Sequence, residues 1–152
     1  DKLQMVFDQG LYDPANEPDI AYAYLFSRFP GEEWRTQREV RRLLDTCFTT
    51  AADGIPGNDD TGTMSAWAVF SMMGFYPDCP GEPYYTLTAP VFDRVEIATE
   101  RGPLVIEAER PADGAGYIGR MTLGGRPLGK YRLSHDELLG GGRLKFELKN
   151  DK

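Results

Sequence analysis

The sequence is poor in several residue types, and each shortage excludes a class of protein. Only two of the 152 residues are cysteines and no C-x-x-C pair occurs, so structural zinc is not expected. The single histidine, His135, leaves no histidine-based triad to assemble, and its position predicts a surface or local structural role. Basic residues number 17 against 24 acids, and the net charge of −7 argues against nucleic acid or an anionic membrane as partner.

Long apolar runs are also absent. No stretch approaches about 18 consecutive apolar residues and no leader opens the chain, so neither a membrane-spanning helix nor a signal peptide is expected. Because Asp1 is not a natural initiator, we expect a piece cut from something longer. With 41% hydrophobic and 12% aromatic residues, the chain is nevertheless long enough to fold around a core.

The first half of the chain has helical periodicity. Residues 19–29 carry apolar side chains at helical intervals and end at Pro30-Gly31, and a clearer apolar stripe runs over residues 40–48 with Thr36 as the expected N-cap. Residues 63–73 are apolar on most sides, so this third helix is predicted to be buried in a larger assembly. The charged residues expected to face water on the second helix are Arg38, Glu39, Arg41, Arg42 and Asp45.

After Gly74 the pattern changes to strands. Short segments rich in Val, Ile, Leu and aromatics are separated by turn signals and predict a meander or half of a sandwich. Ser134 and Glu137 have the spacing of a capping box that opens one helical turn. Helices followed by strands indicate an α+β protein. The predicted strands are residues 84–88, 91–98, 104–108, 117–123 and 143–148.

Residues 53–77, DGIPGNDDTGTMSAWAVFSMMGFYP, combine an acidic loop with the start of the third helix. Unpaired N–H groups and the helix dipole favour a carboxylate there, so Asp59 and Asp60 are expected to stay ionised and fixed in direction. Such a carboxylate suits a general base or a calcium ligand, and Gly57 and Gly62 permit the tight bend. The alternative is that Asp59 or Asp60 only caps the helix.

This loop resembles the C-terminal signature of glycoside hydrolase family 92, the calcium-dependent exo-acting α-mannosidases, whose pattern is G-N-x-D-x-G-x-x-S-A-W followed by G-F-Y-P. Upstream, Asn16-Glu17-Pro18 resembles the N-E-P element of the family, and Trp34 with Thr36-Gln37 resembles its W-x-T-Q. The resemblance covers most of the chain. The residues matching the signature are Gly57, Asn58, Asp60, Gly62, Ser65, Ala66, Trp67, Gly74, Phe75, Tyr76 and Pro77.

The resemblance implies the C-terminal part of a larger enzyme with an (α/α)6 barrel catalytic domain and a β-sandwich domain. Residues 1–75 would be the last barrel helices, and residues 76–152 would be antiparallel strands of the sandwich. Its partner would be the remainder of the same enzyme, namely an N-terminal sandwich and the other barrel helices. We therefore expect this chain to be inactive alone and, by the same resemblance, to belong to a secreted or periplasmic enzyme.

The activity implied is the inverting release of terminal mannose from glycans, with α-1,2 linkages as the expected target. Inversion needs one acid to protonate the leaving oxygen and one carboxylate to activate water. The family base lies in the G-N-x-D loop, which makes Asp60 the candidate base and Asp59 the candidate for assisting it or orienting the water. The proton donor is expected upstream of this segment, and none of Glu17, Glu32 or Glu33 is assigned to that role.

Calcium is the implied cofactor, because it can gather two adjacent mannose hydroxyls with oxygen ligands at about 2.3–2.6 Å. Asn16, Glu17 and Asp60 are the candidate metal ligands, and Asn58 and Glu17 are the candidate sugar ligands. The alternative for Asn16-Glu17-Pro18 is a turn before a helix. Positions 19–21 depart from the family, which often has a serine and histidines there, so no substrate contact is assigned to them.

A second function class is a non-catalytic carbohydrate-binding or structural β-sandwich module in which the acids only cap a helix. A capping aspartate would tolerate Asp60→Asn with a loss of about 1 kcal/mol at most, whereas a base would lose nearly all activity. An all-helical interaction platform is disfavoured by the strand-like segments. Trp67 and Tyr76 could stack on a sugar face but are interpreted as packing residues, and Cys47 is interpreted as a buried thiol.

Overall fold

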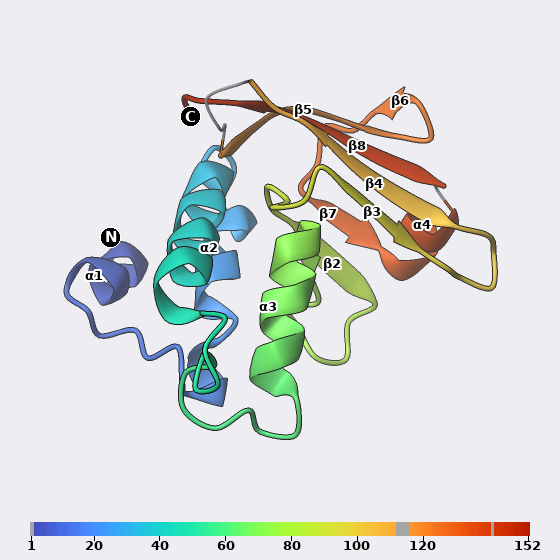
Figure 1. Ribbon diagram of the computed structural model, residues 1–152. Helices are drawn as coiled ribbons and strands as arrows, with labels where there is room; N and C mark the ends of the chain where they lie inside the picture. The colour runs from blue at the N-terminus through green and yellow to red at the C-terminus, as the bar shows by residue number, and fades with distance from the viewer. Residues whose placement is uncertain (1, 112–115, 141) are drawn as a thin grey trace.

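A computed structural model of the chain describes residues 2–111, 116–140 and 142–152, with the strands and the short helix α4 in the second half and the other helices in the first half (Figure 1). The predicted α+β class is confirmed. Among the described residues, no helix combines the length and the apolar character needed to cross a membrane. The helices are α1 Lys2–Asp8, η1 Glu17–Asp19, η2 Tyr22–Arg28, α2 Glu33–Cys47, α3 Thr63–Met73 and α4 His135–Gly140, where η denotes a 3-10 helix.

The predicted third helix is confirmed as α3, but the first two predictions need correction. Residues 19–29 do not form one α-helix, since the two short 3-10 segments η1 and η2 occupy this region. Thr36 is not an N-cap, because α2 begins at Glu33 and Thr36 is buried inside it. Its hydroxyl accepts hydrogen bonds from the backbone N–H of Ser27 at 3.2 Å and from the Ser27 hydroxyl at 2.9 Å. A tertiary contact with η2 therefore uses the group that was predicted to cap the helix.

Glu39 was predicted to face water and does not: its residue is 3% exposed. Its carboxylate accepts hydrogen bonds from Arg38 and Arg42 at 2.9 and 2.8 Å, and from the Gln4 amide of α1 at 3.3 Å. Burial alone would raise the pKa of this carboxyl, but the bonds from Arg42, Arg38 and Gln4 lower it below its usual range. Glu39 thus joins α1 to α2 as an ionised group.

The strands form two sheets in the orders β1-β2-β7 and β3-β4-β8-β5-β6. Of the two arrangements predicted, a meander or half of a sandwich, the meander is wrong, because β8, the last strand in the chain, lies between β4 and β5 and pairs parallel with β4. The other paired strands are antiparallel, as predicted. The strands are β1 Phe75–Tyr76, β2 Tyr84–Leu87, β3 Arg94–Ile97, β4 Leu104–Glu109, β5 Tyr117–Leu123, β6 Arg126–Pro127, β7 Arg132–Ser134 and β8 Arg143–Lys149.

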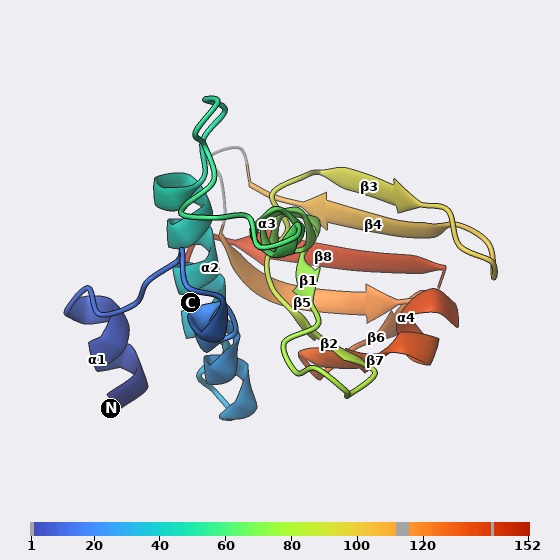
Figure 2. The ribbon, with the colours of Figure 1, turned by 90° about the horizontal axis from the view of Figure 1, so that it is seen from below.

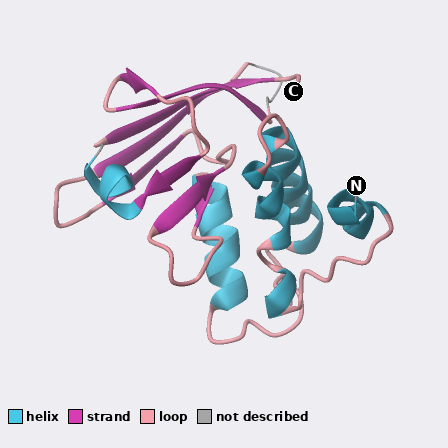
Figure 3. Cartoon of the chain, turned by 180° about the vertical axis from the view of Figure 1, so that it is seen from behind, coloured by secondary structure: helices cyan, strands magenta, loops and turns pink. Residues whose placement is uncertain are grey.

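Two apolar cores explain this arrangement. One is formed by side chains of both sheets, including Leu87, Leu133 and Phe146, each of which is 0% exposed. The other is formed mainly by the helices and contains Tyr24 and Trp67, together with Tyr76 of β1. Helix α3 lies between α2 and the strands (Figures 2 and 3), and its Phe70 packs against both cores. The proposed division at residues 75 and 76 stays a prediction.

Two polar contacts fix the ends of these elements. The predicted capping box of α4 is confirmed: the backbone N–H of Glu137 donates to the Ser134 hydroxyl at 3.2 Å, and the Glu137 carboxylate accepts from the backbone N–H of Ser134 at 2.9 Å. Gln37, the last residue of the W-x-T-Q element, accepts a hydrogen bond from the backbone N–H of Ile118 at 2.7 Å. This buried contact ties α2 to the start of β5.

Candidate active site

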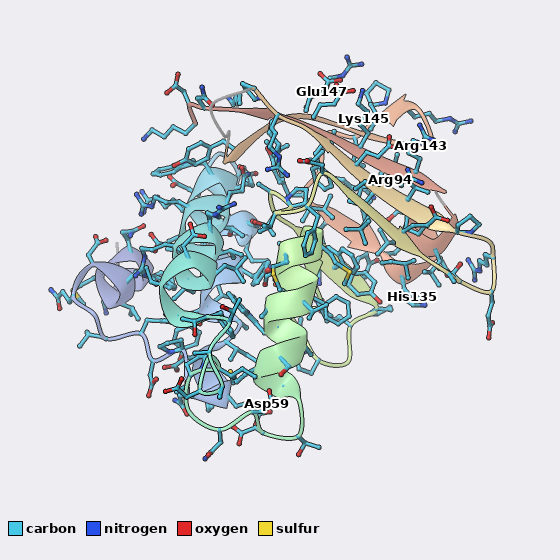
Figure 4. The ribbon with its side chains drawn as sticks, viewed as in Figure 1. Asp59, Arg94, His135, Arg143, Lys145 and Glu147 are labelled. Atoms are coloured by element: carbon cyan, nitrogen blue, oxygen red, sulfur yellow. The ribbon has the colours of Figure 1, made fainter. Side chains whose placement is uncertain are left out.

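Asp59 is the acid that holds the start of α3. Its two carboxylate oxygens accept hydrogen bonds from the backbone N–H and the hydroxyl of Ser65, both at 2.8 Å. Its carbonyl oxygen accepts from the backbone N–H groups of Gly62 and Met64. Figure 4 shows Asp59 at the end of α3 where the helix begins. The N-cap residue of α3 is Gly62 and neither acid, but of the two acids it is Asp59 whose side chain accepts a backbone hydrogen bond from the first turn of the helix. Its role in assisting a base stays a prediction.

Asp60 has a different environment from its neighbour. It is exposed, and its carboxylate has no hydrogen-bond or ion-pair partner within the part of the chain that the structure describes. Its carbonyl oxygen accepts a 2.7 Å hydrogen bond from the Thr63 hydroxyl. The prediction that the helix terminus fixes both acids in direction thus holds for Asp59 alone.

The backbone at Asp60 is strained. Asp60 and Thr61 have φ values of 45° and 61°, and Gly62 follows with 92°, so three consecutive residues are left-handed. This conformation costs an L-residue about 1–2 kcal/mol, and it is a genuine outlier for a β-branched residue such as Thr61. Strain of this kind is concentrated at ligand sites and active sites. Here the strained residues follow Asp59, whose carboxylate is bonded to α3, and include Asp60, whose carboxylate is left in solvent.

The Asn16-Glu17-Pro18 segment forms the turn that was considered as its alternative. η1 begins at Glu17, with Pro18 in its first turn, and Asn16 precedes it with extended backbone angles and no capping bond from its side chain. Both Asn16 and Glu17 are exposed. The turn therefore leaves an amide and a carboxylate free for a ligand.

The acidic loop and this turn are held side by side. A Cβ atom at Gly57, which has a φ of +61°, would lie only 2.5 Å from the Cβ of Ala15, so glycine permits a close approach of the two segments. The indole N–H of Trp67 in α3 donates to the carbonyl oxygen of Ile20 at 2.9 Å. Both contacts join matched signature residues to the segment next to Glu17.

A hollow of about 350 Å³ lies on the Glu17 side of this arrangement. Asp78, at its wall, is engaged by Arg28 and by the Thr86 hydroxyl, each at 2.9 Å. Of the predicted site residues, the structure brings Glu17 to this hollow, whereas Asn16, Asn58, Asp59 and Asp60 do not line it. The lining residues are Glu17, Pro18, Ile20, Ala21, Tyr76, Pro77, Asp78 and Pro80.

The predicted packing residues are buried. Trp67 is 2% exposed and stacks on Phe48 with ring centroids 5.5 Å apart, and Tyr76 is 9% exposed. Cys47 is only half-buried, and it and Cys79 are free thiols. His135 is exposed and its Nδ1 lies 2.8 Å from the Tyr85 hydroxyl, which is a local structural contact as predicted.

The calcium ligands predicted from the sequence form at most part of a coordination shell. Calcium takes six to eight oxygen ligands, and the free oxygens of Asn16, Glu17 and Asp60 have the right chemistry. Within residues 2–111, 116–140 and 142–152, however, no three or more acids, histidines or cysteines gather into a metal site. These donors would need further oxygens from outside this chain, from water or from a sugar.

Comparison with known proteins identifies the family. The protein-family model of the glycosyl hydrolase family 92 catalytic domain matches residues 1–150, so the chain belongs to glycosyl hydrolase family 92. An uncharacterized secreted glycosidase of Arthroderma benhamiae is 28% identical over 155 residues, covering 97% of this chain and 19% of that protein.

Two solved structures from Bacteroides thetaiotaomicron are also similar. An inverting family GH92 mannosidase is 34% identical with a TM-score of 0.84, covering 97% of this chain and 20% of that one. A family GH92 α-mannosidase in complex with mannoimidazole is 28% identical with a TM-score of 0.85, and the match covers 92% of this chain and 18% of that one. The chain therefore spans about a fifth of the length of these relatives.

Proposed function

We propose that this chain is part of an inverting, calcium-dependent exo-α-mannosidase that releases terminal mannose from glycans, with α-1,2 linkages as its target. Family membership supports a glycosidase. Similarity to an inverting mannosidase, and to an α-mannosidase bound to mannoimidazole, supports both the sugar and the stereochemistry.

The observation that carries the proposal is the contrast between the two acids of the loop. Asp59 is engaged at both oxygens by Ser65, while the strained turn leaves Asp60 exposed and without a partner among the described residues. A general base must be ionised and free to accept a proton from water. Asp60 meets this requirement better than Asp59, whose bonds to Ser65 would hold the loop against the start of α3.

In the proposed reaction, the Asp60 carboxylate takes a proton from a water that attacks the anomeric carbon. An acid elsewhere in the enzyme protonates the leaving oxygen, with the two carboxyl groups about 6.5–9.5 Å apart. Asn16, Glu17 and Asp60 would contribute oxygens to calcium, which would bind adjacent sugar hydroxyls when present. Asn58 and Glu17 would contact the sugar directly.

The remainder of the enzyme is the proposed partner of this segment. Val69 of α3 is 49% exposed and Phe92 is 45% exposed, although both are large apolar side chains. A further part of the catalytic domain that covers these two side chains would account for their exposure. The segment alone would be inactive. The name of the Arthroderma relative supports a secreted or periplasmic location.

The proposal is tested with the full-length enzyme that contains this segment. It is incubated with α-1,2-, α-1,3- and α-1,6-linked mannobiose, and the first mannose released is followed by proton NMR. We expect β-mannose to appear first, fastest from the α-1,2 substrate. Release of α-mannose first would contradict inversion. Binding of mannose without hydrolysis of any substrate would favour the non-catalytic carbohydrate-binding module.

A further inference from the structure

The Tyr76 residue of β1 is 9% exposed, but its hydroxyl is not fully buried, and this hydroxyl has no hydrogen-bond partner among the described residues. The hydroxyl of a largely buried tyrosine usually has a partner, and one that opens into a hollow can find that partner in water or in a ligand. Tyr76 also lines the 350 Å³ hollow that contains Glu17. From the sequence this residue was interpreted as packing rather than as a sugar contact, and packing accounts for its ring, whereas its hydroxyl remains available to a ligand in the hollow.

The neighbouring Tyr24 shows what a purely structural tyrosine does in this core. The two rings stack with centroids 5.0 Å apart and planes inclined by 24°. The Tyr24 residue is 0% exposed, and its hydroxyl lies 2.7 Å from the hydroxyl of Ser71. The same apolar core therefore contains one tyrosine with an internal partner and one whose hydroxyl is left for a ligand in the hollow.

The hollow itself has the chemistry of a sugar site. Pro18, Ile20 and Pro77 give it apolar walls, and Glu17 gives it an exposed carboxylate that can accept hydrogen bonds. Burial, together with the charges of Asp78 and Glu17, raises the pKa of Tyr76, so its hydroxyl keeps its proton and can donate. A sugar matches this combination, because it has an apolar C–H face and hydroxyls that both donate and accept.

Asp78 is not a competing ligand in this hollow. Both of its carboxylate oxygens are already engaged, one by the Thr86 hydroxyl and the other by the guanidinium of Arg28. Its side chain is 0% exposed. Glu17 and Tyr76 are thus the acceptor and the donor left in the hollow for a polar ligand.

We infer that the Tyr76 hydroxyl donates a hydrogen bond to a hydroxyl of the glycan, while Glu17 accepts one from a second hydroxyl of the same ligand. This inference rests on the proposed glycosidase function, and it makes Tyr76 a substrate-binding residue. The bond exists in the ground state as well as in the transition state, so its loss should raise KM more than it lowers kcat.

The test compares Tyr76→Phe with Tyr24→Phe in the full-length enzyme, using α-1,2-mannobiose as substrate. Removing the Tyr76 hydroxyl should raise KM about five- to tenfold, leave kcat within about twofold and leave Tm unchanged. Removing the Tyr24 hydroxyl should lower Tm, because it leaves Ser71 unpaired, and should leave KM unchanged. A Tyr76→Phe enzyme with the wild-type KM would overturn the inference.

Failure of the proposed function would look different. If the wild-type enzyme hydrolyses no α-mannoside, the mannosidase proposal is wrong. Titration calorimetry with mannose and with other monosaccharides then tests whether Tyr76 contributes to sugar binding. A sugar that binds the wild type at least fivefold more tightly than Tyr76→Phe would support it. Equal affinities, or no binding of any sugar, would overturn it.

Discussion

Acidic side chains have different surroundings at the two ends of this molecule. On the five-stranded sheet each acid of the outer face lies beside a base: Glu107 contacts Arg94 at 2.9 Å and Arg143 at 3.4 Å, and Glu109 contacts Lys145 at 2.6 Å. Figure 4 shows Arg94, Arg143 and Lys145 on this sheet, well apart from Asp59 at the start of α3. At that other end, Glu17 and Asp60 have no basic partner among the described residues.

The difference separates acids used by the fold from acids available for a ligand. Cross-strand pairs between exposed charges contribute only about 0–1 kcal/mol each, so the sheet face is a solvated surface with a small electrostatic gain. Among the described residues, no hydrogen bond or ion pair uses the carboxylates of Glu17 and Asp60, and Asp60 is presented by a strained turn. An unpaired acid on a strained loop, with a second unpaired acid on the turn packed beside that loop, is the arrangement expected for a ligand site.

The largest expected effect comes from removing the cation proposed to pair with these free acids. Chelation of calcium in the full-length enzyme should abolish turnover of an α-mannoside, because the sugar hydroxyls lose the ion that gathers them. Steady-state rates are measured in excess chelator and again after calcium is restored, which should recover the activity. Undiminished turnover in excess chelator would exclude a role for calcium.

A second prediction concerns the contact between Gly57 and Ala15. Gly57→Ala should lower kcat/KM by about 10- to 100-fold, because the added Cβ would lie 2.5 Å from Ala15 and displace the acidic loop from the Glu17 turn. Ala15→Gly in the same molecule should restore part of the loss. Activity is measured by initial rates and stability by thermal melting.

The control for this change is Gly10→Ala. Gly10 has a similar φ of +66°, but an added Cβ there would meet nothing within 4 Å. Both alanine variants should lose stability through backbone strain, and only Gly57→Ala should lose activity. Equal activities in the two variants would show that the spacing of the two segments is unimportant.

A third, smaller effect, on stability, is expected at Asp59, the acid of the loop whose carboxylate is bonded within the fold. Asp59→Ala removes both acceptors of the Ser65 bonds at the start of α3, and should lower the free energy of unfolding by about 0.5–2 kcal/mol. Denaturant unfolding of the full-length enzyme measures it. A variant with unchanged stability would show that the contacts with Ser65 contribute nothing to the fold.

The smallest effect is expected on the sheet. Glu107→Gln removes the charge facing Arg94 and Arg143, and should cost no more than about 1 kcal/mol while leaving kcat and KM unchanged. The cost should shrink further as salt is added. A large loss of activity from this substitution would contradict the division between structural and ligand-binding acids.

Local patterns in the sequence predicted the local structure well. The apolar run of α3 and its acidic loop, the strand Tyr117–Leu123 and the capping box at Ser134 depend on neighbouring residues, and all are present. What failed depends on distant partners. The burial of Glu39 requires Gln4 of α1, and the central place of β8 requires a parallel pairing with β4 that no short-range signal announces.

The same reasoning applies to the candidate site. The family signature identified the acidic loop and the Glu17 turn, and the structure shows both side by side through Gly57 and Trp67. The hollow could not be predicted, because it is made by Glu17 and by Tyr76, far apart in the sequence. Which of the two adjacent acids bonds to the first turn of α3 depends on the left-handed turn at Thr61, which the sequence does not reveal.

The most direct test of the central claim is the activity of Asp60→Asn beside that of Asp59→Asn in the calcium-loaded full-length enzyme. We predict that Asp60→Asn lowers kcat by about 10²–10⁴-fold with the wild-type Tm, because it removes the proposed base and no side-chain contact seen among the described residues. Asp59→Asn should mainly lower Tm. An Asp60→Asn enzyme that turns over at close to the wild-type rate would contradict the assignment of Asp60 as the general base.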